Sequence, residues 1–337
     1  MKIISKTIKL LPVFLLVLGL SACSDDDNND GPVAMTTTVV DIALANNLTS
    51  LAAALEATDL VTTLQGTGPF TVFAPDNAAF TALLNATGLD LDNLSTDEEA
   101  LVRNILLNHV IIGDTIDAST LITAGSGYQS TAAIGPDNAN LSLYFNVNNG
   151  AVELNGGMNA DKGANVTDPD NEATNGTVHV INKVLLPPTI VDFALANPAL
   201  SNLVAALQSA DSQPGTDLIG TLSGDGPFTV FAPTDDAFGA LLLELDPSGN
   251  TGLGDLDPAT VEAVLLVHVV GDNVRSSELS SGPVPTLGGD ITLDASTLTL
   301  TDSLDREIGI ISTLVDIQGI NGVVHVVDRV IRPAAAD

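Results

Sequence analysis

The four histidines are the side chains of this 337-residue chain best suited to acid–base or metal chemistry near neutral pH. They form two equivalent pairs in two similar halves of the sequence: His109 with His179, and His268 with His325. The first of each pair follows an aliphatic residue by four positions, as on the apolar face of a helix, and the second lies among valines. No HxxxH, HxE or CxxC pattern accompanies them. We therefore expect core histidines that are hydrogen-bonded to backbone or hydroxyl groups, with neither a catalytic nor a metal-binding role.

Carboxylates are the other groups that could do chemistry. The segment "DPDNEATNG" at residues 168–176 gathers Asp168, Asp170 and Glu172 and could hold Ca²⁺, although it lacks the D-x-D-x-D-G spacing of an EF-hand loop. Turns favour the same residue types, so a solvated loop is the preferred interpretation. Carboxylate pairs suited to glycoside hydrolysis are weak indications in a chain with 42 acidic residues. Nucleophile-elbow, P-loop and dinucleotide motifs are missing from the sequence, and we expect no cofactor.

The N-terminus has the composition of an export signal. Three lysines precede an apolar run at residues 10–20, which is too short for a membrane-spanning helix. The following "LSAC" resembles a bacterial lipoprotein box, so we expect residues 1–22 to be a signal peptide and Cys23 to be lipidated. Cys23 is the only cysteine, so the chain cannot form an internal disulfide, and lipidation explains the odd thiol. The alternative is ordinary cleavage that leaves a free thiol or removes it.

Residues 23–35 are polar and acidic and predict a flexible tether above the membrane. The acidic run also resembles surface-export signals of some Gram-negative lipoproteins, with a plain solvated linker as the alternative. All 42 acidic residues follow Cys23, whereas three of the ten basic residues precede it, which gives the exported chain a formal charge of −35. Such a chain should repel nucleic acid and anionic lipid, so we expect membrane contact through the lipid anchor only. The expected location is the bacterial envelope, in the outer membrane and exposed on its surface.

Four blocks of sequence occur twice, in the same order. In the first half they begin with "VVDIALANN", "FTVFAPDNAAF", "ILLNHV" and "NGTVHVINKV". The offsets to the second copies are 151, 158, 159 and 146 residues, so insertions and deletions fall between the blocks, where loops are expected. We therefore predict two domains of ordinary size, residues 36–186 and 187–335, with a short, stiff joint at two consecutive prolines.

Local patterns predict an α+β fold in each half, with helices mainly first and strands mainly last. Residues 70–73 form a short apolar run bounded by prolines and predict a strand. Ser95 with Glu98 is a capping box for the helix that follows, and Asn149-Gly150 predicts a hairpin turn. Helical spacing is shared by four leucines, namely Leu44, Leu48, Leu51 and Leu55. Pro198 interrupts the same region in the second copy, which favours two short helices over one long helix.

The phrase at residues 70–80, repeated at 228–238, consists mostly of packing and turn residues. Asp76 and Asn77 in the first copy, like Asp235 and Asp236 in the second, suit helix capping. The threonines of the phrase, Thr71 and Thr229, are expected to add only local hydrogen bonds. The phrase therefore indicates architecture and not chemistry.

These repeated phrases resemble a known family. "FTVFAPDNAAF" and "FTVFAPTDDAF" resemble the first signature of fasciclin (FAS1, beta-Ig-h3) domains, and "NGTVHVINKVLLPP" and "NGVVHVVDRVIRP" resemble the second. The resemblance covers residues 36–333 and implies that each half is a small β-sandwich wedge flanked by short helices. It also implies extracellular adhesion without catalysis.

The resemblance makes the motif residues structural or adhesion candidates. These candidates are His109, His179, His268, His325, Asp76, Asn77, Asp235 and Asp236. The family often carries a Tyr-His pair between its signatures, but here Asn108 and Val267 precede the histidines, and no Arg-Gly-Asp occurs. Integrin-type recognition therefore does not follow from the resemblance.

Three functions are weighed. The first is a lipid-anchored, non-catalytic surface protein that engages extracellular protein or polysaccharide and gains avidity from many weak contacts. The second is an exopolysaccharide-active enzyme or small-ligand-binding envelope lipoprotein, for which a deep pocket with convergent carboxylates or histidines is required. The third is a structural envelope component that associates through cation-bridged acidic faces. We favour the first.

Overall fold

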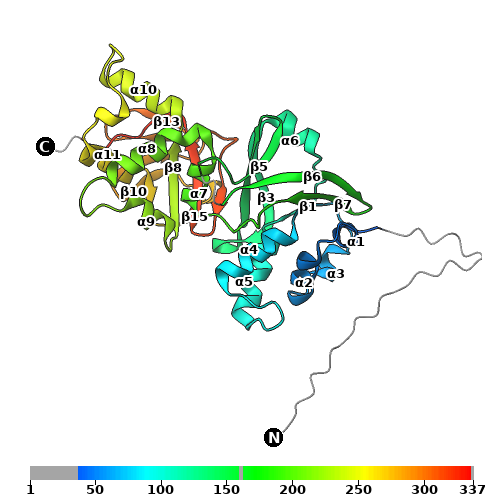
Figure 1. Cartoon of the computed structure of the whole chain (residues 1–337). Helices are drawn as coiled ribbons and strands as arrows, with labels where there is room; N and C mark the ends of the chain where they lie inside the picture. Colours follow the sequence, from blue (N-terminus) through cyan, green and yellow to red (C-terminus); the bar gives the residue numbers. More distant parts are fainter. Residues whose placement is uncertain (1–36, 159–161, 335–337) are drawn as a thin grey trace, which may run out of the picture. The chain divides into compact units, whose positions relative to one another are not determined.

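The computed structural model describes residues 37–158 and 162–334 (Figure 1). The expected signal peptide, the lipidation site Cys23 and the tether at residues 23–35 lie outside the described residues. The residues from Thr36 onward form one compact unit that contains both repeats.

The first half begins with helices and ends with strands. Its helices are α1 (Val39–Ala45), α2 (Thr49–Ala57), α3 (Val61–Leu64), α4 (Asn77–Thr87), α5 (Thr96–Leu107) and α6 (Ala118–Ala124), with a 3-10 turn η1 at Pro136–Asn138. Its strands are β1 (Phe70–Pro75), β2 (Val110–Ile112), β3 (Ser126–Ile134), β4 (Asn140–Asn148), β5 (Ala151–Leu154), β6 (Ala164–Ala173) and β7 (Gly176–Ile181).

The second half repeats this order. Its helices are α7 (Ile190–Ala196), α8 (Ser201–Ala210), α9 (Leu218–Ser223), α10 (Asp235–Leu245) and α11 (Pro258–Leu266), with 3-10 turns η2 (Pro198–Leu200), η3 (Leu253–Asp255) and η4 (Ser276–Glu278). Its strands are β8 (Phe228–Pro233), β9 (Val269–Val270), β10 (Gly282–Thr286), β11 (Gly289–Asp294), β12 (Thr299–Thr301), β13 (Glu307–Gly309), β14 (Ile317–Gly319) and β15 (Gly322–Val327). The α+β prediction is confirmed in both halves.

One parallel strand pair organises each half. β1 lies parallel to β7, with Phe73 opposite His179, and antiparallel to β2. β8 lies parallel to β15, with Phe231 opposite His325, and antiparallel to β9. The two repeated signature phrases are therefore paired neighbours, although they come from opposite ends of each repeat.

The remaining strands complete a sandwich. In the first half the strand order is β2-β1-β7-β6-β5-β4-β3, and β6 pairs with both β5 and β7. Register shifts interrupt the β6–β7 pairing, and such bulges bend a strand. In the second half the order is split into two sheets, β14-β15-β8-β9 and β10-β11-β12-β13.

Each parallel pair separates two apolar cores. In β1, Val72 and Ala74 belong to the core beneath the helices, whereas Phe73 belongs to the core within the sandwich. In β8, Ala232 and Phe231 divide in the same way. Because successive side chains of a strand point to opposite faces, one apolar strand can serve both cores. This explains why the repeated phrase is apolar at nearly every position.

Several local predictions are confirmed. Ser95 and Glu98 form the capping box at the start of α5. The turn between β4 and β5 is Asn149-Gly150, with positive φ angles of 52° and 81° that suit an Asn-Gly hairpin. The repeated phrase begins with a strand, β1, in the first half and with β8 in the second.

The prediction of two short helices in this region is confirmed, but the prediction that four leucines share one face was partly wrong. Leu48, Leu51 and Leu55 are buried, but Leu44 is 52% exposed. The first helix, α1, ends at Ala45, Asn47 has a positive φ of 56°, and α2 begins at Thr49. The break shifts the helical phase, so residues on either side of it do not share one face.

The two halves make direct contacts across the joint. The Met158 N–H donates to the Leu195 carbonyl at 2.8 Å, and the Lys162 ammonium lies 2.8 Å from the Asp192 carboxylate. The Gln318 N–H donates to the Ser142 hydroxyl oxygen at 3.0 Å. Aromatic rings also meet here, because the Tyr128 and Phe193 ring centroids are 5.8 Å apart in an edge-on arrangement.

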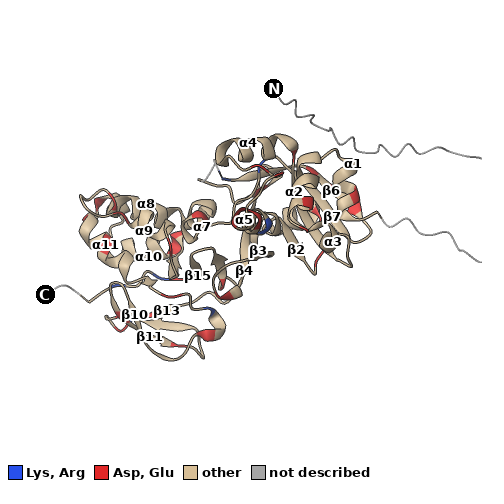
Figure 2. Cartoon of the chain, turned by 90° about the horizontal axis from the view of Figure 1, so that it is seen from below, with Lys and Arg blue, Asp and Glu red and all other residues tan. Residues whose placement is uncertain are grey.

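The surface of both halves is acidic. Asp and Glu are spread over helices, strands and loops, and Lys and Arg are few (Figure 2). Within the described residues, no single helix is long and apolar enough to cross a membrane. One pair, α7 with the segment Pro198–Ala210, meets this length and composition only when taken together, across a bend of 105°.

Candidate functional site

His109 and His268 lie just beyond the ends of α5 and α11 and are fully engaged with the backbone. The Nδ1 atom of His109 is 2.7 Å from the Ile105 carbonyl, and its Nε2 atom accepts from the Leu185 N–H at 2.8 Å. His268 makes the same bonds to Val264 and Ile331, at 2.7 and 2.9 Å. The prediction that these histidines lie on the helices was wrong by two residues, because both helices end before them. Each imidazole instead satisfies a carbonyl in the last helical turn and holds the segment after the closing strand.

His179 and His325 occupy the closing strands β7 and β15, as predicted. The Nε2 atom of His179 is 2.8 Å from the Ile116 carbonyl, and its Nδ1 atom accepts from the Asp170 N–H at 3.1 Å. The corresponding bonds of His325 go to Val274 and Asp316, at 2.9 and 3.3 Å. The His179 ring also stacks on Phe73 of the first signature, with centroids 5.4 Å apart. This second pair therefore ties the two signatures together.

Burial keeps these imidazoles neutral. Desolvation lowers the pKa of His109 to about 4, against the opposing hydrogen bond to Ile105, and lowers the pKa of His268 to about 4 for the same reason. Desolvation also lowers the pKa of His179 and of His325. All eight ring nitrogens have a backbone partner, so none is free to accept a proton from a substrate. The expectation of core histidines bonded to backbone agrees with these contacts.

Thr71 and Thr229 do more than the sequence suggested. The Thr71 hydroxyl donates to the Asp114 carbonyl at 3.0 Å and accepts from the Ile116 N–H at 2.9 Å. The Thr229 hydroxyl bridges Asp272 and Val274 in the same way, at 2.6 and 2.9 Å. The expectation of only local hydrogen bonds was wrong, since the partners are more than 40 positions away. The threonine hydroxyl of β1 or β8 thus makes the hydrogen bonds that a neighbouring strand would otherwise make to the loop after β2 or β9.

Replacing Thr71 or Thr229 by valine is expected to lower the free energy of unfolding by about 2 kcal/mol, because a partly buried backbone carbonyl and N–H lose their partner. Serine at either position keeps the hydroxyl and should recover most of the loss. Urea unfolding followed by far-UV circular dichroism measures both. A valine at the exposed Thr62 is the control and should change little. Equal stability of the valine and serine variants contradicts the assignment.

The polar residues of the first signature cap helices, in two ways. Asp76 caps its own helix α4 by accepting from the Ala79 N–H at 2.7 Å. Asn77 instead caps the earlier helix α2, where it accepts from the Ser50 N–H at 2.9 Å. Asp235 does the same in the second half by accepting from the Asn202 N–H at 2.7 Å. Asp236 is exposed in the first turn of α10, where the helix dipole favours a negative charge.

Sequence reasoning missed one pair of residues. The Oδ1 atom of Asn175 accepts from the Val39 N–H at 2.9 Å, and its Nδ2 atom donates to the Leu64 and Gly66 carbonyls. Asn321 makes the same three bonds, to Ile190, Leu222 and Gly224. Each asparagine thus fastens the opening helix of its repeat to the turn before the closing strand. The available signal was the Asn-Gly pair that opens the second signature in both copies.

The acidic segment at residues 168–176 is mostly strand and not a loop. Asp168, Asp170 and Glu172 lie in β6, where all three are exposed. The Asp170 carboxylate accepts from the Ala118 N–H at 2.8 Å, and the Asp168 carboxylate accepts from the Asn171 amide at 3.1 Å. Within residues 37–158 and 162–334, no group of three or more His, Cys, Asp or Glu side chains is placed to hold a metal ion. The solvated-loop interpretation of this segment was therefore wrong in its secondary structure.

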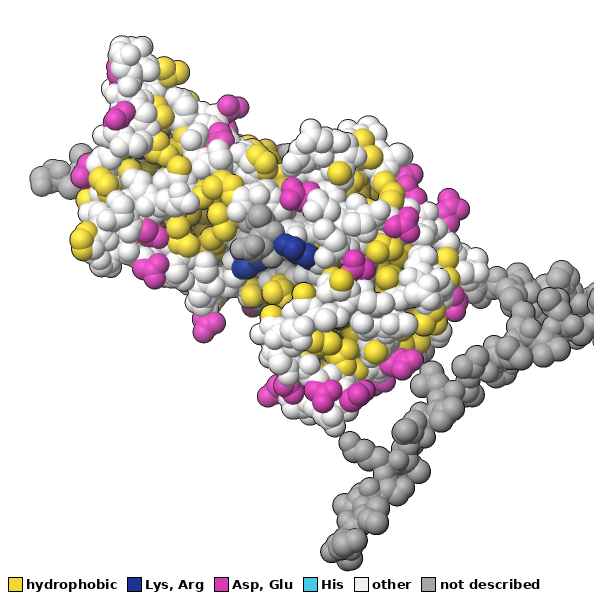
Figure 3. Space-filling model, in the orientation of Figure 1, with side chains coloured by type: hydrophobic (Ala, Val, Ile, Leu, Met, Phe, Trp, Pro, Cys, Tyr) yellow, Lys and Arg dark blue, Asp and Glu magenta, His cyan; other side chains and the backbone are white. Residues whose placement is uncertain are grey.

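The exposed face supplies the remaining candidates for contact. Apolar side chains form small, separate groups between polar ones, with carboxylates around them (Figure 3). Individual exposed apolar residues occur in both halves, among them Leu101, Ile112, Leu243 and Leu304. Scattered exposure of this kind is ordinary for a folded surface and defines no single patch.

Comparison with known proteins places these features in a family. The sequence profile of the Fasciclin domain matches residues 46–187 and again residues 198–333. Protein sll1483 of Synechocystis is 37% identical over 147 residues, which cover 43% of this chain and 73% of that protein. Human periostin is 30% identical over 293 residues, which cover 83% of this chain but only 30% of periostin.

A solved structure shows the same fold. It is the FAS1 domain pair from the insect cell adhesion molecule Fasciclin I, which matches with a TM-score of 0.54 at 20% sequence identity. The match covers 87% of this chain and 98% of that chain. Both copies of the domain are therefore accounted for by one known arrangement of sheets and short helices.

Proposed function

This chain belongs to the fasciclin domain family, with the domain present twice, and we propose that it is a non-catalytic, lipid-anchored surface protein that binds extracellular protein or polysaccharide. Fasciclin domains occur in secreted and surface proteins, cell-adhesion proteins among them. In this proposal residues 1–22 direct export, Cys23 carries the lipid, residues 23–35 form the tether, and residues 36–186 and 187–335 present the binding surfaces. The anchor lies in the outer membrane with the domains facing outward.

One observation carries the proposal. The four histidines are the side chains best suited to acid–base chemistry, and they make corresponding backbone hydrogen bonds in both repeats. Because these side chains stabilise the fold in both copies, we infer that the domains are a scaffold that binds partners through its outer surface. Two copies on one anchored chain then raise the effective concentration of a weak binding surface.

Electrostatics narrows the class of partner. A chain with 42 acidic and ten basic residues repels polyanions and attracts neutral or cationic surfaces. We therefore propose a neutral polysaccharide or a basic extracellular protein, with a rate of association that falls as salt increases for the basic partner.

Cells that carry Cys23→Ala should lose attachment to a matrix-coated surface to the same extent as cells without the protein. The physical reason is that a domain pair released from the membrane cannot transmit adhesion and loses its multivalency. Attachment is counted after a fixed shear wash, with protein level checked by immunoblot of cells and medium. Asn28→Ala, in the same tether, is the matched control and should attach normally. Normal attachment of cells without the protein counts against adhesion, whereas retention of Cys23→Ala on the membrane counts against the anchor.

A further inference from the structure

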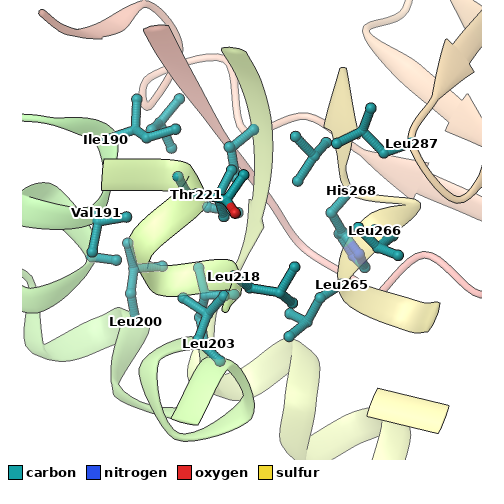
Figure 4. A pocket seen from close by; sticks show the side chains of 17 residues that line it. Ile190, Val191, Leu200, Leu203, Leu218, Thr221, Leu265, Leu266, His268 and Leu287 are labelled. Carbon is teal, nitrogen blue, oxygen red and sulfur yellow. The ribbon is translucent and has the colours of Figure 1, made fainter. Parts of the chain in front are cut away.

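The second half contains an apolar cavity of about 70 Å³ that the adhesive role does not use. It lies between helices α7, α8 and α9 and the strands β8 and β15 (Figure 4). Its lining includes Ile190, Val191, Leu200, Leu203, Leu218 and Leu265. The end of α11 and the exposed Leu287, after β10, complete the wall.

The polar groups of the lining have partners within the protein. The Thr221 hydroxyl donates to the Asp217 carbonyl at 2.7 Å. Both ring nitrogens of His268 are occupied by backbone groups. The described residues that line the cavity include no Phe, Tyr or Trp, so a sugar ring finds no aromatic face to stack on. The binding free energy of a ligand here comes from apolar contacts alone, and a cavity of this kind binds apolar groups in preference to water.

The first half has an equivalent cavity that is much smaller. The equivalent cavity there, lined by Val39, Ala43 and Leu51 among others, measures only about 20 Å³. Five positions separate Leu55 from Leu60 in the first half, and eleven separate their counterparts, Leu207 and Leu218. The second half therefore has six additional residues before its third helix. In the first half Leu60, the N-cap residue of the short helix α3, is 1% exposed, whereas its counterpart Leu218 in α9 is only half-buried. The insertion therefore goes together with a third helix that packs less deeply and a larger space beneath it.

We propose that this cavity binds the aliphatic chain of a small uncharged amphiphile. A space of this size holds about two to three methylene-sized groups, each comparable in volume to a water molecule at roughly 30 Å³. It therefore takes the end of the chain, and the rest extends past the exposed Leu287. The uncharged head follows from a lining whose polar groups are already hydrogen-bonded, and the Asp211 carboxylate beside it, which accepts from the N–H of the lining residue Leu218 at 2.6 Å, disfavours an anionic head group. The site is independent of the adhesive surface, so either can fail without the other.

Titration of the purified protein with 1-hexanol tests the proposal. In a sample with labelled Ile, Leu and Val methyl groups, the signals of Ile190, Leu203 and Leu218 should shift and saturate. The equivalent methyl groups of the first half, Val39 and Leu51, should not, which provides a control within the same molecule. Hexanoate should bind at least several-fold more weakly than 1-hexanol. Absence of saturable shifts, or equal shifts in both halves, overturns the site, and equal affinity for hexanoate overturns the choice of head group.

One substitution made in both repeats separates binding from folding. Ala194→Leu extends a side chain into the larger cavity, and Ala43→Leu does so at the equivalent place in the smaller one. Ala194→Leu should leave the melting temperature unchanged or raise it and weaken 1-hexanol binding at least tenfold. Ala43→Leu should lower the melting temperature through overpacking and leave binding unchanged. Undiminished binding in a folded Ala194→Leu protein contradicts the assignment. A difference in molar mass between the Ala194→Leu protein and the unmodified protein, measured by light scattering, also contradicts it, because the cavity then binds a second copy of the chain.

Discussion

Lowering the pH from 7 to 4 is expected to cost each half of the protein about 3 kcal/mol of its free energy of unfolding, through one buried histidine apiece. Burial holds the pKa of His109 and of His268 at about 4, whereas an exposed imidazole titrates near 6.5. Between pH 4 and pH 6.5 these two histidines are protonated in the unfolded chain but remain neutral in the folded chain. Stability is therefore complete above pH 6.5 and is lost progressively as the pH falls toward 4.

Other groups act in the same direction. Desolvation lowers the pKa of His179 and His325, so their protonation also favours the unfolded chain as the pH falls. Hydrogen bonds from Ser248 and Thr251 hold the pKa of Asp246 at about 2, so this carboxylate adds its loss only below the range of the histidines. A transition dominated by the histidines is thus distinguishable by its position on the pH axis.

Urea unfolding at pH 7, 5.5 and 4, followed by far-UV circular dichroism, measures this loss. The method suits a chain with two tyrosines and no tryptophan. His109→Gln keeps hydrogen-bonding capacity and does not titrate. Its stability should fall less steeply below pH 6.5, by up to about 1.4 kcal/mol per pH unit. His268→Gln is the matched variant in the other half and should behave alike. An unchanged slope in both variants means that the histidines are not the groups that titrate.

Much of the fold could be predicted because its determinants are local. A capping box needs only Ser95 and Glu98, and a hairpin turn needs only Asn149 and Gly150. The strand β1 follows from a short apolar run between prolines. Duplication helped further, since a pattern found in both halves is less easily a coincidence. Pro198 in the second copy also predicted the break between the first two helices, but the spacing of the leucines does not report the backbone conformation at Asn47, so Leu44 was placed on the wrong face.

The candidate site was harder to predict because its bonds are long-range. Thr71 looks like any strand threonine until the loop at Asp114 and Ile116 is brought beside it. His109 was placed on its helix because apolar spacing continues past the residue where the helix ends. The larger cavity of the second half depends on how a six-residue insertion positions α9, and only packing determines that. Sequence thus identified which residues matter more reliably than it identified their partners.

Asn321→Ala is expected to lower the free energy of unfolding by about 3 kcal/mol. Asn321 is buried, and its side chain accepts from the Ile190 N–H at 3.0 Å while it donates to the Leu222 and Gly224 carbonyls at 2.8 Å each. Alanine leaves these backbone groups without partners and frees α7 from the turn before β15. Asn175→Ala removes the same bonds in the first half and should cost less, since Asn175 is only half-buried.

Aspartate at position 321 tests the acceptor bond and the donor bonds of the Asn321 side chain separately. It keeps an oxygen for the Ile190 N–H but turns a carboxylate toward two carbonyl oxygens, so Asn321→Asp should be at least as destabilising as alanine at pH 7. Asn85→Ala, at an exposed position in α4, is the control and should change stability by less than about 0.5 kcal/mol. If Asn321→Asp is as stable as the unmodified protein, the donor bonds contribute nothing, and the opening helix is held by its apolar face alone.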